Sequence, residues 1–326
     1  DKLHPRITDT AKRLWFIYVA YTIVETLLLY LAGMSLFDAV NHSMSTMASG
    51  GFSTKNDSLA HWNHLPLVHY VIIIFMFLAG TNFVLSYFAF TGKIQKIFRD
   101  NEFLTFAKFI FVFSIIVFGV LVTQVDLDKD SFHHPQVFGE IESSLRHSVF
   151  QVLAIVTTTG FVTADYTSWN SFLTVFFFGL MFLGGSAGST SGGIKVVRHL
   201  LMIKSGVLEF KRALHPNAII QPRYNGKVVS QEIIGNILGF FILYMLSFII
   251  GSLVFGLMGL DFESAIGVAA SSLGNVGPAI GDFGPASNFS QLPAIGKLWS
   301  SFLMLMGRLE LFTVLILLTP YFWNKN

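Results

Sequence analysis

Six long apolar stretches separated by polar segments dominate the hydropathy pattern of the chain. Each could form a transmembrane helix, which needs about 20 mostly apolar residues, and they cover residues 14–34, 66–90, 103–125, 172–203, 233–260 and 295–322. Three further segments between consecutive spans have a helical pattern but are too short to cross a bilayer, at residues 37–48, 145–156 and 261–271. Because each of the three ends in a polar run that contains glycine, we interpret them as re-entrant helices.

Composition agrees with a membrane protein that is entirely α-helical. The chain is 53% hydrophobic and only 12% charged, with a mean hydropathy of +0.62, whereas soluble domains carry about twice that fraction of charge. A net charge of +2 is too small to indicate a nucleic-acid partner. The chain has no cysteine, which excludes disulfides, thiolate metal sites and cysteine nucleophiles.

The distribution of Lys and Arg predicts the orientation. Basic residues concentrate before the first span and in the connectors between spans two and three and between spans four and five: Lys2, Arg6, Lys12, Arg13, Lys93, Lys96, Arg99, Arg198, Lys204, Lys211, Arg212, Arg223 and Lys227. By the positive-inside rule these segments are cytoplasmic, so the three short helices enter from the outside. We interpret residues 204–230 as a basic cytoplasmic linker that sets topology and meets anionic lipid.

The three inter-span segments can be superposed, which indicates an internal repeat. Residues 36–52 match 145–161 without a gap, and 260–275 form the third copy. The key glycines are Gly51, Gly160 and Gly274, which are 160 − 51 = 109 and 274 − 160 = 114 residues apart. The repeat units are residues 1–92, 93–203 and 231–326.

The repeated unit favours a monovalent cation. A short helix that enters from outside places its partially negative C-terminal end at mid-membrane, and glycine lets the following loop turn its carbonyls toward a common axis, where they replace an ion's hydration shell. No carboxylate, the usual ligand of divalent ions, lies in 48–53, 157–163 or 271–276. The expected filter loops are 49–53, 157–161 and 272–276, with candidate ion-binding residues Ser49, Gly50, Gly51, Thr158, Thr159, Gly160, Ser272, Leu273 and Gly274. The alternative is that these small residues only pack helices together; three copies at matching topology favour the ion site.

A glycine-rich run interrupts the fourth predicted span at residues 184–193: Gly184, Gly185, Ser186, Ala187, Gly188, Ser189, Thr190, Ser191, Gly192 and Gly193. Five glycines in ten residues should break the helix. Counted at 1.5 Å per residue, Arg308 in the last span has a matching depth. Our hypothesis is a gate loop held by Arg308; the alternatives are that Arg308 pairs with Glu310 or Glu25, or extends to the membrane surface.

Other polar residues allow two interpretations each. Asn82 either lines a cavity under the filter or makes an interhelical hydrogen bond. Asp38 and Asp261 fall at the N-termini of short helices, where an acid is stabilised by the helix dipole. His61, His64, His69, His133 and His134 lack metal-site spacing, so we expect solvated histidines in outer loops.

Several motifs resemble those of the Trk/Ktr/HKT superfamily of potassium transporters, with the bacterial Trk membrane subunits most similar. They are Ser-Gly-Gly-Phe-Ser-Thr at 49–54, Thr-Thr-Thr-Gly-Phe at 157–161, Ser-Leu-Gly-Asn-Val-Gly-Pro at 272–278, the run at 184–195 and Gly-Arg-Leu-Glu at 307–310. The resemblance implies helix–pore helix–filter loop–helix units around a pseudo-fourfold pore. Only the second, third and fourth of four units are found, so we interpret the chain as part of a longer protein. It also implies a gate at the glycine-rich loop, contacted by the arginine, a homodimer, a cytoplasmic ring of nucleotide-binding regulatory subunits, and a place in the bacterial inner membrane.

The sequence therefore predicts a non-enzymatic subunit for K+ uptake without a cofactor, K+ being the transported ion. The preference for K+ over Na+ comes from the resemblance. Gated channel-like flux and symport coupled to Na+ or H+ both remain open. A competing function is an intramembrane hydrolase centred on Ser186 or Ser189, because residues 184–188 fit G-x-S-x-G, although that motif needs a preceding strand. A purely structural subunit is the third possibility.

Overall fold

The computed structural model describes residues 3–215, 220–309, 311–317 and 319–323. Within them nearly all regular structure is helical, and one antiparallel hairpin pairs β1 (Arg223–Tyr224) with β2 (Lys227–Val228). The helices in chain order are α1 (Leu3–Leu31), α2 (Leu36–Met47), α3 (Pro66–Gly80), α4 (Phe83–Phe90), α5 (Asn101–Gln124), α6 (Glu140–Val156), α7 (Tyr166–Trp169), α8 (Ser171–Leu180), α9 (Val196–Leu214), α10 (Gln231–Leu257), α11 (Phe262–Gly274), α12 (Ala294–Arg308), α13 (Leu311–Leu317) and α14 (Pro320–Trp323).

Three of the predicted spans are unbroken helices and the other three are interrupted. Among the described residues, 11–31, 101–124 and 231–257 are long and apolar enough to cross a membrane. The predicted span 66–90 is instead bent by 107° between α3 and α4, and the last span is bent by 117° between α12 and α13. The span 172–203 is split into α8 and α9, which the glycine-rich segment separates. Because helix breaks inside a membrane free backbone groups, each break marks a place where the chain must supply partners.

The three short helices lie between the spans, as predicted, and the first turns of α2 and α11 are capped by nearby side chains. The Ser35 side chain accepts a hydrogen bond from Asp38 N at the start of α2, and the Asp261 carboxylate accepts from Glu263 N and Ser264 N at the start of α11. These bonds satisfy amides that a helix N-terminus leaves free. Asp38 and Asp261 thus lie at helix N-termini, as the sequence predicts.

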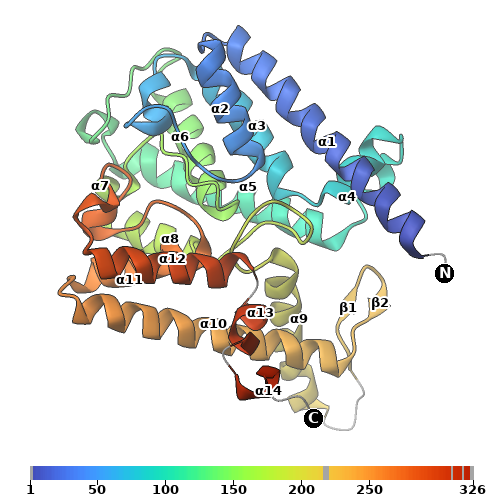
Figure 1. Ribbon diagram of the computed structural model, residues 1–326. Coiled ribbons are helices and arrows are strands. Elements are labelled where there is room, and N and C mark those ends of the chain that lie inside the picture. The colour runs from blue at the N-terminus through green and yellow to red at the C-terminus, as the bar shows by residue number, and fades with distance from the viewer. Residues whose placement is uncertain (1–2, 216–219, 310, 318, 324–326) are drawn as a thin grey trace.

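Consecutive units lie side by side around a shared centre. In Figure 1, α1, α2 and α3 form the upper part, α10, α11 and α12 run alongside one another below, and α5 and α6 lie between, in agreement with the contacts between these helices. The N-terminal end of α1 and the β1–β2 hairpin lie on one side of the molecule, and α7 lies on the opposite side. This arrangement agrees with a basic cytoplasmic side and an outer side that the short helices enter from.

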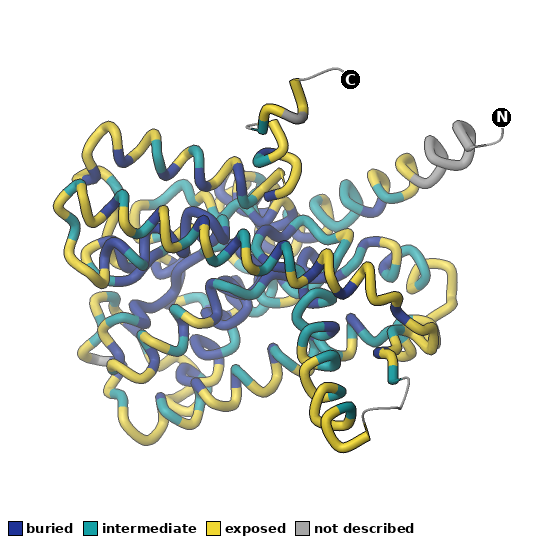
Figure 2. Tube along the Cα trace, turned by 90° about the horizontal axis from the view of Figure 1, so that it is seen from below, coloured by how far each residue is buried: buried dark blue, intermediate teal, exposed yellow. Residues whose placement is uncertain are grey.

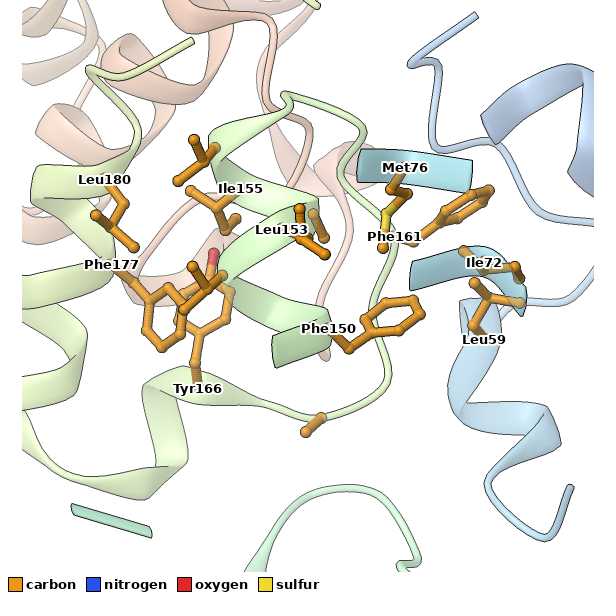
Figure 3. Packing of buried hydrophobic residues seen from close by; sticks show 14 of the residues in the cluster. Leu59, Ile72, Met76, Phe150, Leu153, Ile155, Phe161, Tyr166, Phe177 and Leu180 are labelled. Atoms are coloured by element: carbon orange, nitrogen blue, oxygen red, sulfur yellow. The ribbon is translucent and has the colours of Figure 1, made fainter. Parts of the chain in front are cut away.

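The core surrounds α6, and the outer surface is apolar. Phe150 and Leu153 of α6 are buried between Met76 of α3 and Phe177 of α8, as Figure 3 shows. In Figure 2 the central segments are coloured as buried and the outward-facing turns as exposed. Large apolar side chains lie on those exposed turns, including Phe111 of α5. An exposed apolar surface of this extent fits a surrounding of lipid rather than water.

Close packing of α12 against the end of α11 generates a testable prediction. A Cβ atom at Gly307 would lie 1.9 Å from Leu273 O and 2.6 Å from Asn275 Nδ2, whereas one at Gly119 on the exposed face of α5 would have no neighbour within 4 Å. We expect Gly307→Ala to lower the thermal unfolding temperature of the purified protein, because overpacking costs roughly 1–3 kcal/mol. The control Gly119→Ala should leave that temperature unchanged or raise it. Equal melting temperatures for the two variants would contradict this packing.

Candidate functional site

The loops that follow α2, α6 and α11 share one backbone path. We call residues 48–53, 157–162 and 275–279 the first, second and third central loops. In each loop a residue adopts a left-handed φ and a glycine with positive φ follows two positions later: Ser49 (51°) and Gly51 (67°), Thr158 (53°) and Gly160 (78°), Asn275 (56°) and Gly277 (112°). The residue between them donates its amide to a carbonyl five positions earlier: Gly50 N to Ser45 O (2.8 Å), Thr159 N to Ala154 O (2.9 Å) and Val276 N to Ser271 O (2.9 Å). The internal repeat therefore extends to the backbone conformation of the loops.

The structure corrects the predicted register of the third loop by three residues. Helix α11 continues through Ser272 and Leu273 to Gly274, so these residues form its last turn rather than an irregular loop, and the helix does not end at 271. The counterpart of Gly51 and Gly160 is Gly277, which lies 277 − 160 = 117 residues after Gly160. Ser272-Leu273-Gly274 has the same order of hydroxyl residue, any residue and glycine as the other two loops, which is why the sequence placed the third loop there. Asn275 adopts the left-handed turn because its short polar side chain tolerates that conformation.

The three central loops meet edge to edge. A Cβ atom on Gly51 would lie 1.9 Å from Thr159 O of the second loop, and one on Gly160 would lie 2.0 Å from Val276 O of the third. A Cβ atom on Gly277 would lie 3.6 Å from the Cα atom of Gly160. Each glycine of the first two loops thus leaves room for the backbone of the next loop, and any other residue would separate them. The first central loop therefore lies against the second, and the second against the third, in sequence order.

Hydroxyl groups and helix ends, rather than acids, hold these loops. Ser45 Oγ accepts from Phe52 N at 2.7 Å, and Ser271 Oγ donates to Gly277 O at 2.8 Å. Thr157 and Thr159 hydroxyls lie 2.8 Å apart behind the second loop. The central loops contain no Asp or Glu, and the partially negative ends of α2, α6 and α11 point to them. This environment favours a monovalent cation over an anion.

Ionised acids lie at the outer ends of two of these helices. Burial raises the pKa of Asp38, but hydrogen bonds from Thr54 and Ser35 and the nearby Lys55 outweigh it, so the net pKa is lowered. The Ser264 side chain, with backbone amides, lowers the pKa of Asp261. Both groups therefore carry negative charge at neutral pH at the N-terminal ends of α2 and α11.

The glycine-rich loop, residues 184–193, lies against the inner side of all three central loops. Thr190 Oγ1 lies 2.9 Å from Ser49 Oγ of the first loop, and Gly192 N donates to Thr158 Oγ1 of the second loop at 2.5 Å. A Cβ atom at Gly192 would lie 3.0 Å from Asn275 Cβ of the third. The segment predicted to break the fourth span is non-helical and is brought to the predicted filter loops.

The break between α3 and α4 supplies partners for this loop. Gly80 O accepts from Ser186 N at 2.9 Å, and Phe83 N donates to Gly188 O at 3.2 Å. The Asn82 side chain accepts from Val84 N at 2.8 Å and so begins α4. Its Oδ1 atom would lie 3.1 Å from a Cβ atom at Gly188. Asn82 is thus a helix cap beside the glycine-rich loop, at the point where the predicted span bends.

Arg308 contacts the glycine-rich loop directly. Its Nη1 atom donates to Thr190 O at 2.7 Å. A cavity of about 230 Å³ on this side is lined by Ser189, Thr190, Ser191, Gly192, Gly193, Lys195, Arg198, Phe240, Gly307 and Arg308. Of the alternative partners, Glu25 is buried in α1 and faces Thr46, whereas Glu310 lies outside the described residues. Arg308 therefore places its charge on a backbone carbonyl of the loop.

The geometry does not favour a serine hydrolase. The Ser186 hydroxyl is buried without a hydrogen-bond partner in the described part of the chain. Ser189 Oγ donates to Ser186 O at 2.6 Å and lies 2.8 Å from Ser191 Oγ. A nucleophilic serine needs a base within hydrogen-bond reach, and these contacts provide none.

Sequence analysis missed a buried polar network behind the second central loop. His69 and His134, expected in solvated loops, are buried. His134 Nε2 lies 3.1 Å from Asp130 Oδ2, His134 Nδ1 lies 3.2 Å from His147 Nε2, and His147 Nδ1 lies 2.9 Å from Thr163 Oγ1. The only available signal was the number of histidines close to α6 in the sequence. Among the described residues, no cluster of three or more His, Cys, Asp or Glu side chains could hold a metal ion.

Comparison with known proteins identifies relatives over the whole chain. The family model of TrkH, a cation transport protein, matches residues 1–324. The Trk system potassium uptake protein TrkH of Escherichia coli (strain K12) is 38% identical over 327 residues, which cover 100% of this chain and 65% of that protein. TrkG of the same organism is 36% identical over 326 residues, covering 100% of this chain and 64% of that protein.

A solved structure has the same fold. The crystal structure of the potassium transporter TrkH from Vibrio parahaemolyticus matches with a TM-score of 0.88 and 34% sequence identity, covering 98% of this chain and 66% of that chain. The present chain thus spans slightly less than two thirds of the length of these relatives.

The contact between the first and second central loops leads to a prediction. Gly51→Ala should lower the yield of folded protein and its melting temperature, since a Cβ atom would meet Thr159 O and the φ of 67° is unfavourable for alanine. Gly50→Ala is the matched control, because its nearest neighbour is the movable ring of Phe52 at 3.2 Å. Size-exclusion chromatography and thermal unfolding in detergent measure both. A harmless Gly51→Ala would contradict the contact.

Proposed function

We propose that this chain, which belongs to the TrkH family of cation transport proteins, forms three sides of a gated, channel-like pore for K+ uptake. The observation that carries this proposal is the close approach of Gly51 to Thr159 O and of Gly160 to Val276 O. Three loops arranged in this way leave one side of a ring uncovered, and we infer that a fourth unit of the complete protein closes it. The chain is a membrane protein that acts without covalent chemistry.

The chemistry of the central loops supports a partly dehydrated monovalent ion. Backbone carbonyls can replace its water shell, and the carboxylates that divalent ions usually require are absent from these loops. We propose the backbone of Ser49, Gly50, Thr158 and Thr159 as ligands, together with Asn275 and Val276 in place of Ser272 and Leu273. The names of the relatives from E. coli and V. parahaemolyticus support K+ as the ion.

The glycine-rich loop is proposed as the gate. It lies across the inner side of the central loops, where Thr190 and Gly192 contact them. Arg308 donates a hydrogen bond to the carbonyl of Thr190. A hydrogen bond from a charged donor is stronger than one from a neutral donor. Ions then pass only when the loop moves away from the axis.

The basic segment from α9 to the hairpin contains Lys204, Lys211 and Arg212, and we propose that it faces anionic lipid and cytoplasmic regulatory subunits that bind nucleotide. We also propose that the complete protein acts as a homodimer in the bacterial inner membrane.

The gate is tested by ion flux through the complete protein. Deletion of residues 187–191, or Arg308→Ala, should raise rubidium uptake into cells that lack other K+ uptake systems. A loss of about 1.4 kcal/mol from the closed state would change the closed-to-open ratio tenfold. The matched control Arg99→Ala removes a charge from an exposed cytoplasmic connector and should leave uptake unchanged. If both loop deletion and Arg308→Ala leave uptake at the original level, the loop is not a gate.

A further inference from the structure

The segment before α10 contains a closed hairpin rather than only an extended linker. Residues Asn225 (φ 48°) and Gly226 (φ 79°) form the turn between β1 and β2, and positive φ at both central positions is typical of a two-residue hairpin turn. Lys204 Nζ donates to Arg223 O at 3.0 Å, which ties β1 to α9. The adjacent Val229 is buried. The hairpin is therefore an ordered element packed against the membrane helices.

The hairpin turn contacts the N-terminal end of α5. Asn225 Nδ2 donates to Asp100 Oδ2 at 2.8 Å, and Asn101 N donates to Asn225 Oδ1 at 2.8 Å. The other oxygen of Asp100 accepts from Glu102 N and Phe103 N, at 3.0 and 2.9 Å, and so caps α5. The hairpin therefore binds the residues that set the position of the first turn of α5.

Glu102 connects this contact to the glycine-rich loop. Its Oε1 atom accepts from Ala187 N at 2.6 Å, and its Oε2 atom accepts from the hydroxyl of Tyr224 in β1 at 3.4 Å. The side chain is buried, with 3% of the residue exposed. Ala187 and Tyr224 lie 85 and 122 residues from Glu102 in sequence. A single carboxylate thus joins the cytoplasmic hairpin to the loop that lies beneath the central loops.

The electrostatic surroundings of Glu102 and Tyr224 support the hydrogen bond from the tyrosine hydroxyl to the carboxylate. Glu102 is in the first turn of α5, where the positive end of the helix dipole stabilises a carboxylate. Burial, followed by the negative charges of Glu102 and Asp100, raises the pKa of Tyr224. The tyrosine therefore keeps its proton at neutral pH and donates it to Glu102. Ala187 lies three residues before Thr190, so the glycine-rich loop is held at two points, by Glu102 and by Arg308.

We propose that Glu102 is a positioning residue that couples the hairpin 223–228 to the glycine-rich loop. Displacement of the hairpin moves Tyr224 and Asp100, the residue that caps α5, away from Glu102. The carboxylate of Glu102 then separates from the amide of Ala187, and the glycine-rich loop loses its hydrogen bond at that end. The consequence for ion flux rests on the proposed gate, whereas the link itself is a property of the folded chain and can be measured separately.

The test uses the complete protein in liposomes and two readouts, amide hydrogen exchange in the peptide that contains Ala187 and rubidium flux. Glu102→Ala should speed exchange of that peptide by about tenfold or more, because a buried amide loses a charged acceptor. Glu102→Gln keeps an oxygen acceptor and should restore much of the protection. Tyr224→Phe removes only the distant hydroxyl and should speed exchange in the same peptide by a smaller factor. The control is Glu232→Ala, an exposed acid in the first turn of α10, which should change neither readout.

The outcomes separate the link from the gate. Faster exchange at Ala187 in both Glu102→Ala and Tyr224→Phe supports the coupling; exchange that is unchanged in either variant overturns it. If Glu102→Ala raises flux but adds nothing once residues 187–191 are deleted, the carboxylate acts through the loop, as proposed. If the deletion raises flux and Glu102→Ala does not, the gate stands and the coupling is wrong. If exchange responds while the deletion leaves flux unchanged, the link stands and the gate is wrong.

Discussion

Backbone groups that leave a helix inside a membrane must find partners within the protein, because lipid offers none. This constraint explains the centre of the molecule. The central loops satisfy it with hydroxyl side chains such as Ser45 and Ser271, and with amides that donate back to the helices they follow. The carbonyls that remain, including those of Thr159 and Val276, lie at the contacts between loops. Backbone carbonyl oxygens at this place are suited to bind a partly dehydrated cation.

The same constraint positions the glycine-rich loop. Ten consecutive residues without helical structure would be costly if exposed to lipid. Here the break between α3 and α4 offers the carbonyl of Gly80 as an acceptor and the amide of Phe83 as a donor to Gly188 O. Arg308 and Glu102 then hold the loop from opposite sides, one through a carbonyl and the other through an amide. Both bonds reach the loop from outside its own span. The proposed gate is therefore held by contacts from α3, α5 and α12.

Much of this architecture could be predicted from the sequence because it depends on length, apolar content and glycine spacing. The short helices, the break at 184–193 and the depth of Arg308 all follow from these quantities. The third loop could not be placed correctly, because Ser272-Leu273-Gly274 has the composition of a loop but the hydrogen bonds of a helix end. The role of Glu102 depends on partners that lie 85 and 122 residues away in sequence. No local pattern encodes those contacts.

The central claim is that the backbones of the three central loops converge on one ion path. The most direct measurement is anomalous X-ray diffraction from crystals of the complete protein grown with rubidium. The account predicts an anomalous peak on the axis bounded by the loops of Gly51, Gly160 and Gly277, next to backbone oxygens. Rubidium bound only at carboxylates elsewhere, with no peak between these loops, would contradict it.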